Sequence, residues 1–219
     1  MKNIILIAAP AAGKGTEAAK LKNDFNMVHI STGDLLREAT SKGDEKGNMI
    51  NELISNGHFV SDEIVLDLLK ERILKSDCDN GYILDGFPRN LSQAYAYDKI
   101  LEDLNKDIGI VIVLDIDKEI AKSRICGRLS CPVCGKIYNT NTSLKPKNEG
   151  LCDICNVQLS KRSDDNEETY EERYNTYLEK TEPLISYYSQ QGILYHVDAG
   201  VSPEETHKQV LKILGEKND

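Results

Sequence analysis

The chain has 219 residues, which is enough for one compact domain with small inserted segments, or at most two domains. With 40% apolar and 29% charged residues, it has the composition of a globular protein that can bury a core. Its net charge of −9 disfavours binding to nucleic acid or to an anionic membrane surface. An anionic ligand would therefore need a local group of cationic side chains.

Apolar runs give no sign of export or of a membrane span. None approaches the roughly 20 residues needed to cross a bilayer, and the run at residues 4–7 is too short for a secretory signal. We therefore expect a cytoplasmic protein.

Short apolar runs without alternation recur along the chain and are typical of strands buried on both faces, as in a parallel sheet. They lie at residues 4–9, 27–30, 82–84, 110–114 and 194–197. Amphipathic helical patterns separate them, so we predict a doubly wound α/β sheet. Such sheets bind ligands at the carboxyl ends of their strands.

Three helix starts can be predicted from capping sequences. A hydroxyl followed by two acids occurs at residues 61–63, and residues 202–205 combine a cap, a first-turn proline and a capping-box glutamate. Asp165 with Glu168 has the spacing of a second capping box and is predicted to open a long helix.

Two stretches interrupt the alternation of strands and helices. Residues 31–60 contain polar helical segments with no strand between them, and residues 128–162 lack helical periodicity. We interpret both as inserts into a core made of residues 1–30, 61–127 and 163–219.

Residues 8–16 join the first strand to a helix and have the character of a phosphate-binding loop. Such a loop turns backbone N–H groups toward phosphate oxygens, and a lysine reaches the outer phosphates. The strict pattern has glycine where this chain has Ala8, and an extra glycine follows the lysine, so a simple turn with an exposed lysine is the alternative. The core of the motif is Gly13, Lys14, Gly15 and Thr16.

Four of the six cysteines form two C-x-x-C pairs separated by the seventeen residues 135–151. This spacing suits a tetrahedral Zn²⁺ bound by four thiolates in a closed, structural site. Disulfides or free buried thiols are the alternatives. The candidate ligands are Cys131, Cys134, Cys152 and Cys155.

Further motifs follow the loop along nearly the whole chain. They are Ser31-Thr32-Gly33-Asp34-Leu35-Leu36-Arg37, Asp85-Gly86-Phe87-Pro88-Arg89 with Gln93, Arg124-Ile125-Cys126-Gly127-Arg128, Arg162-Ser163-Asp164-Asp165 with Arg173, and Thr181-Glu182-Pro183-Leu184-Ile185. Together with the loop, and in this order, they resemble the adenylate kinase family. The resemblance implies a P-loop core, an insert at residues 31–60 that binds a nucleoside monophosphate (NMP), and a mobile zinc-bearing lid at residues 128–162.

The resemblance implies Mg²⁺-dependent phosphoryl transfer, ATP + AMP = 2 ADP, and nothing in the sequence demands more than a monomer. The implied ATP-binding residues are Gly13, Lys14, Gly15, Thr16, Arg124 and Arg128. The implied AMP-binding residues are Thr32, Arg37, Gly86, Arg89, Gln93, Arg162 and Arg173. The implied catalytic residues are Lys14, Arg89, Arg128, Arg162 and Arg173, and the implied magnesium ligands are Thr16 and Asp85.

Three residues depart from the family pattern. Ala8 and Ala11 replace glycines, and an alanine at positive φ costs about 1–2 kcal/mol. We expect the loop to work, because Gly13 and Gly15 remain. Asn90 replaces a usual threonine and is more typical of UMP/CMP kinases. Two alternatives follow. Asn90 leaves open a UMP/CMP-type kinase, and the altered loop leaves open a catalytically impaired relative that binds nucleotides or a partner.

Overall fold

The structure is a computed structural model that describes residues 3–55, 60–162 and 165–218. Ser163 and Asp164, two residues of the motif that begins at Arg162, lie outside these ranges. Within the described ranges, no helix combines the length and the apolar character that a membrane span requires.

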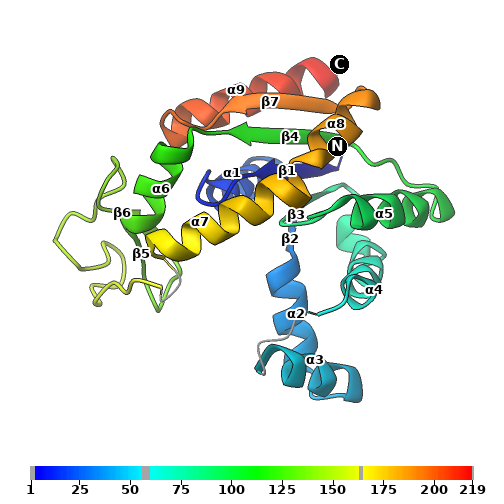
Figure 1. Cartoon of the computed structure of the whole chain (residues 1–219), viewed down its shortest axis with the longest axis horizontal. Coiled ribbons are helices and arrows are strands. Elements are labelled where there is room, and N and C mark those ends of the chain that lie inside the picture. The colour runs from blue at the N-terminus through cyan, green and yellow to red at the C-terminus, as the bar shows by residue number, and fades with distance from the viewer. Residues whose placement is uncertain (1–2, 56–59, 163–164, 219) are drawn as a thin grey trace.

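Five parallel strands form the central sheet in the order β2-β3-β1-β4-β7 (Figure 1). Strand β1 lies in the centre, where Ile5 is aligned with Leu84 on one side and with Val111 on the other. All five predicted strands are confirmed, to within one residue at each end. They are β1 (Ile4–Ala8), β2 (Val28–Ser31), β3 (Tyr82–Asp85), β4 (Ile110–Asp115) and β7 (Leu194–Asp198).

Helices connect the strands and cover both faces of the sheet, which confirms the predicted doubly wound α/β fold (Figure 1). A 3-10 turn, η1 (Ser76–Cys78), and a π-helical turn, η2 (Tyr177–Thr181), accompany them. The helices are α1 (Lys14–Phe25), α2 (Thr32–Ser41), α3 (Glu45–Ser55), α4 (Asp62–Ile73), α5 (Leu91–Asp103), α6 (Lys118–Cys126), α7 (Glu167–Thr176), α8 (Pro183–Gln190) and α9 (Pro203–Asn218).

Successive side chains of the central strand enter two different hydrophobic layers. Ile5 and Ile7 pack with residues of α4, α5 and α8, whereas Ile4 and Leu6 pack with residues of α1 and α9. None of these four side chains is more than 2% exposed. The strands read as unbroken apolar runs because both faces of the sheet are buried.

Two of the three predicted helix starts are confirmed. Ser61 caps α4 and accepts a hydrogen bond from the backbone N–H of Ile64 at 3.4 Å. Ser202 caps α9 in the same way, because its hydroxyl oxygen accepts from the N–H of Glu205 at 3.2 Å.

The predicted capping box at Asp165 is wrong. Helix α7 is capped by Asn166, whose side-chain oxygen accepts from the N–H of Thr169 at 2.9 Å. Asp165 is fully buried and forms an ion pair with Arg128, far away in the sequence. The predicted long helix is also interrupted, since η2 separates α7 from α8.

Two segments project from the sheet at separate places (Figure 1). One consists of α2 and α3. The other contains a two-stranded antiparallel ribbon, β5 (Arg128–Ser130) and β6 (Ile137–Asn139). The boundaries of the NMP-binding insert and of the lid stay a prediction.

Helix α9 is tied to α1 by His207, whose side chain is 13% exposed. The imidazole of His207 lies 2.8 Å from Glu17 Oε1 and 2.7 Å from Asp24 Oδ2, and Lys20 of α1 donates to the Pro203 carbonyl at 2.7 Å. Burial opposes charge on the imidazole, but the two carboxylates outweigh it and raise the pKa of His207. Burial also raises the pKa of Glu17.

We expect His207→Gln to lower the free energy of unfolding by about 1–3 kcal/mol at pH 6, and by less at pH 9. The folded-state pKa of His207 lies above its unfolded value, so the stabilisation is complete below about pH 6.5 and is lost as pH rises through the folded pKa. The raised pKa of Glu17 acts in the same direction at lower pH.

Urea unfolding of the wild type and the variant between pH 6 and 9 measures this difference. His196→Gln is the control, because His196 pairs with Asp115 at the surface and its side chain is 50% exposed. A stability difference for His207→Gln that does not change with pH would contradict the prediction.

Candidate functional site

The phosphate loop places a lysine at the start of α1. Gly13 caps the helix with φ of 104°, a conformation that glycine adopts without strain. The Nζ of Lys14 donates to the Ala8 carbonyl at 3.0 Å. Burial lowers the pKa of Lys14, Asp85 opposes this shift, and Arg89 adds to it. A half-buried cation therefore lies at a helix N-terminus, where the peptide dipoles also favour an anion.

One of the two replaced glycines does occupy a left-handed position. Ala11 has φ of 64°, whereas Ala8 is a regular, buried residue of β1. Ala11 also packs against a small cluster formed by Ala121, Ile125 and Tyr170. The strained alanine therefore brings the loop into contact with α6 and α7.

A second cation lies beyond the carboxyl end of the neighbouring strand β3. Arg89 Nε donates to the Gly86 carbonyl at 2.8 Å, and its Nη2 lies 3.4 Å from Thr32 Oγ1. Gly86 has φ of 77°, and a Cβ there would lie 3.3 Å from Arg89 Nη2. Asp85, next to Gly86 in the sequence, lies beside the phosphate loop. A Cβ added to Gly15 of the loop would lie 3.8 Å from Asp85 Oδ2. The predicted residues at the ends of β1 and β3 are therefore neighbours.

Gln93 contacts the backbone of Arg89, and it is 6% exposed. Its Oε1 accepts from the Arg89 N–H at 2.7 Å, and its Nε2 donates to Asp62 Oδ1 at 2.6 Å. Asn90 caps α5 by accepting from the Gln93 N–H, and its Nδ2 donates to Asp62 Oδ2 at 3.3 Å. Asp62 was predicted only as a first-turn acid, because its partners lie 28 and 31 residues along the chain.

Arg37 lies on the projecting helix α2 and folds back on its own element. Its Nη2 lies 2.6 Å from Asp34 Oδ1, and both side chains are exposed. Hydrogen bonds from Ser31 and then from Arg37 lower the pKa of Asp34. The partner that the structure gives Arg37 is therefore a residue of its own helix.

Arg124 and Arg128 are held by acceptors on other elements. Arg128 forms a two-point contact with buried Asp165, through Nε at 2.7 Å and through Nη2. Arg124 extends from α6 toward the end of β7, and burial lowers its pKa against the opposing effect of Asp198. The guanidinium of Arg124 donates to the carbonyls of Ala199, Gly200 and Val201 at 2.7–3.2 Å.

The two remaining predicted arginines are exposed. Arg173 lies on α7, which packs beside α6 and, through Tyr170, against Ala11 of the loop. Arg162 lies at the end of the cysteine-bearing segment, after its last bridge to Ser130. The structure thus brings Arg173's helix to the loop but places Arg162 on a projecting segment.

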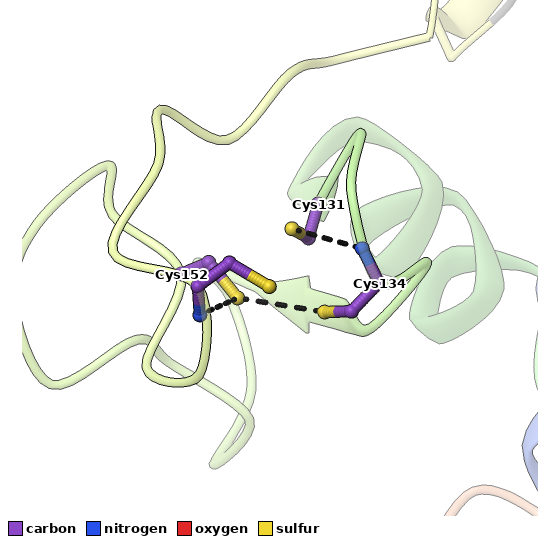
Figure 2. A group of neighbouring side chains, drawn as sticks. Cys131, Cys134 and Cys152 are labelled. Atoms are coloured by element: carbon purple, nitrogen blue, oxygen red, sulfur yellow. Dashed lines mark hydrogen bonds between the residues drawn. The ribbon is translucent and has the colours of Figure 1, made fainter.

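The four predicted cysteine ligands form one cluster, of which Figure 2 labels Cys131, Cys134 and Cys152. Their sulfur atoms all lie within 4.8 Å of one another, and Cys134 Sγ lies 3.7 Å from Cys152 Sγ. Four thiolates at 2.3 Å from a tetrahedral zinc ion would be about 3.8 Å apart. The cysteines are all free, so the disulfide alternative is wrong and the donor set fits zinc.

The two knuckles around this cluster have the same backbone geometry. Each ends in a left-handed residue, Gly135 or Asn156. In each, the amide of the second cysteine donates to the sulfur of the first at 3.5 Å, as Figure 2 shows for Cys134 and Cys131. The segment buries little else, because its core consists of Cys131, Tyr138, Cys152 and Leu159.

The surroundings of the cluster shift the pKa values of two of its cysteines in opposite directions. A hydrogen bond from Tyr138 lowers the pKa of Cys152 to about 6, whereas the neighbouring sulfur of Cys134 raises the pKa of Cys155 to about 12. Crowded sulfurs cannot all ionise without a nearby positive charge, and a bound metal cation supplies that charge.

A lysine-bearing loop after the first strand, a helix N-terminus behind it and a second cation at the next strand define a phosphate-loop nucleotide-binding protein of the α/β class. The adenylate kinase family model matches residues 6–193. Adenylate kinases of Kosmotoga olearia and Archaeoglobus fulgidus are 44% identical over 212 residues, covering 97% of this chain and 98% and 97% of the relatives. The adenylate kinase of Thermotoga neapolitana is 42% identical over 216 residues, covering 98% of both chains. The chain therefore belongs to the adenylate kinase family and is a nucleoside monophosphate kinase.

We expect Ala11→Gly to raise the free energy of unfolding by up to about 1 kcal/mol, because glycine relieves the strain at positive φ. Ala8→Gly should lower it by about 0.5–1 kcal/mol, because Ala8 lies in a regular strand. Urea unfolding of both variants against the wild type tests the contrast. Equal destabilisation by the two substitutions would show that the loop conformation is not the cause.

Proposed function

We propose that the chain catalyses reversible, Mg²⁺-dependent phosphoryl transfer, ATP + AMP = 2 ADP. The supporting observation is that the phosphate loop and Arg89 lie close together although they follow different strands. Asp85, at the end of β3, lies beside Gly15 of the loop, and Arg89 folds back on Gly86, the next residue. Two cations so placed can hold two phosphate groups next to each other. Phosphoryl transfer needs chiefly such alignment and charge neutralisation.

On the ATP side, the loop N–H groups, Lys14 and Thr16 would bind the phosphates. Asp85 offers a carboxylate beside the loop, and together with the Thr16 hydroxyl it has the oxygen donors that Mg²⁺ prefers. The edge of the Arg124 guanidinium is taken up by three carbonyls, so one of its flat faces would lie against the adenine.

On the AMP side, Arg89 would bind the phosphate in a two-point contact, with Arg37 joining from α2. Thr32 and Gly86 lie against Arg89, and Gln93 would contact the base. Arg37 would exchange Asp34 for phosphate, since its present partner lies on the surface of its own helix.

Arg128, Arg162 and Arg173 would surround the transferring phosphoryl group once the cysteine-bearing segment closes as a lid. Closure would exclude water, which otherwise competes as the phosphoryl acceptor. Arg128 would then share its donors between Asp165 and phosphate oxygens. The lid would be residues 128–162 and the NMP-binding insert residues 31–60.

The four thiolates would hold a structural Zn²⁺ that orders the lid and takes no part in transfer. A closed set of four sulfurs leaves no ligand position for water or substrate. We further propose a cytoplasmic monomer that binds ATP, AMP and ADP, and neither nucleic acid nor membrane.

Asn90 does not by itself favour a UMP/CMP-type kinase. Its side chain caps α5 and donates to Asp62. A threonine hydroxyl could perform both roles, so the residue has a local explanation that is independent of the base.

A coupled assay that offers AMP, CMP, UMP or GMP with ATP and Mg²⁺ tests the proposed reaction. We expect turnover with AMP, and Arg89→Ala should lower kcat/KM for AMP by roughly 10²–10³-fold through lost phosphate stabilisation. Lys99→Ala, which removes an exposed cation from helix α5, should leave the rate unchanged. Preference for CMP or UMP, or no turnover of any monophosphate, would overturn the proposal.

Removal of the metal should lower the melting temperature, because the lid has almost no other core and structural zinc contributes roughly 10–16 kcal/mol in small domains. Elemental analysis should find one zinc per chain, and calorimetry with and without a chelator should show the shift. Cys134→Ser should lose the metal, whereas Cys126→Ser, outside the cluster, should keep it. A melting profile insensitive to metal removal would exclude this role.

A further inference from the structure

The amide of Gln93 is fixed in one orientation by the chemistry of its neighbours. The Arg89 backbone N–H can only donate, so the amide atom 2.7 Å away must be the oxygen. The Asp62 carboxylate can only accept when ionised, so the atom 2.6 Å away must be the nitrogen. Because the side chain is buried, a reversed amide would lose both hydrogen bonds and face two like groups.

Asp62 is in turn held by a second amide. Asn90 caps α5 through its Oδ1, which accepts from the Gln93 N–H at 2.8 Å. That bond leaves only the Asn90 Nδ2 to face Asp62, at 3.3 Å from Oδ2. Each oxygen of the Asp62 carboxylate therefore accepts from a different amide, and the carboxylate joins the first turn of α4 to the start of α5.

Each polar group of the Gln93 amide uses one of its two hydrogen-bonding positions on these partners among the described residues. One acceptor position on Oε1 and one N–H on Nε2 remain for a ligand. Adenine presents the complementary pair, an acceptor at N1 and a donor at its 6-amino group. Hypoxanthine presents the reverse, a donor at N1 and an acceptor at O6. Cytosine shares the adenine pattern, and guanine and uracil share the reversed one.

We propose that Asp62 is a positioning residue that determines base specificity by holding the Gln93 amide in the orientation that suits adenine. This inference rests on the proposed function, in which Gln93 contacts the base of the monophosphate. Asp62 itself does not contact the base. By fixing the amide, Asp62 leaves the site with only one hydrogen-bonding pattern. In a 6-oxo purine, the N1–H donor would then face the Gln93 Nε2 donor, and the O6 acceptor would face the Oε1 acceptor. A site built in this way rejects a mismatched ligand because its buried groups are left without partners.

The test compares AMP with IMP, because these monophosphates differ only at N1 and at the 6 position of the base. Equilibrium binding is measured by calorimetry, and turnover by a coupled assay with ATP, for the wild type, Asp62→Asn and Asp62→Ala. Glu63→Gln is the matched control, because it removes a charge from the same first turn of α4 at an exposed position. This control accounts for any loss of the favourable charge at the helix N-terminus.

We expect Asp62→Asn to reduce the preference for AMP over IMP about tenfold, because one carbonyl oxygen cannot satisfy two amide donors. The loss should appear in the Kd and KM of AMP, while the KM of ATP stays at the wild-type value. Asp62→Ala should reduce the preference at least as far, and Glu63→Gln should retain it. Melting temperatures of all variants show whether each one is folded.

An unchanged AMP-to-IMP preference in a folded Asp62 variant would overturn the inference, as would an equal loss of affinity for both nucleotides. A wild type that binds neither monophosphate would overturn it as well. A wild type that binds AMP in preference to IMP but does not transfer phosphate would contradict the proposed reaction alone, because the binding comparison still measures the role of Asp62.

Discussion

A protein that binds phosphate groups needs several cationic side chains close together, although like charges repel one another. Other groups of the protein must therefore hold these side chains in place. Here the loop lysine and three of the predicted arginines are held by oxygen atoms of the protein itself. Lys14 and Arg89 donate to backbone carbonyls, Arg128 to a buried carboxylate, and Arg124 to three carbonyls of the chain after β7. A carbonyl oxygen orients a cation without neutralising its charge, whereas the carboxylate of Asp165 both orients and neutralises Arg128.

Elements whose cause is local could be predicted from the sequence. The five strands are buried on both faces, so each appears as a short apolar run whatever its neighbours are. Ser61 and Ser202 cap their helices through hydrogen bonds that span three residues. The cysteine cluster also follows from spacing, because each C-x-x-C turn places its two sulfurs together and only the meeting of the two knuckles needs the fold.

The features that could not be predicted all depend on contacts between distant segments. Asp165 has the sequence context of a helix cap, but Arg128, 37 residues earlier, provides a stronger partner for a buried carboxylate. The sequence left open whether Ala8 or Ala11 has a positive φ, and the structure assigns it to Ala11, where the loop packs against α6 and α7. Asp62 resembles any first-turn acid until α4 and α5 are placed side by side.

These distant contacts also separate two kinds of selectivity in the site. In the proposed reaction the cations would bind phosphate, which every nucleotide carries, so they could not choose between bases. Selection between bases requires hydrogen-bond donors and acceptors at fixed positions. A glutamine amide offers them only when its surroundings exclude one of its two orientations. In this chain the reversed orientation of the Gln93 amide is excluded by two partners. The backbone N–H of Arg89 binds the amide oxygen, and the carboxylate of Asp62 binds the amide nitrogen. Selection of the base would thus depend on the packing of α4 against α5 as much as on the residue that contacts the ligand.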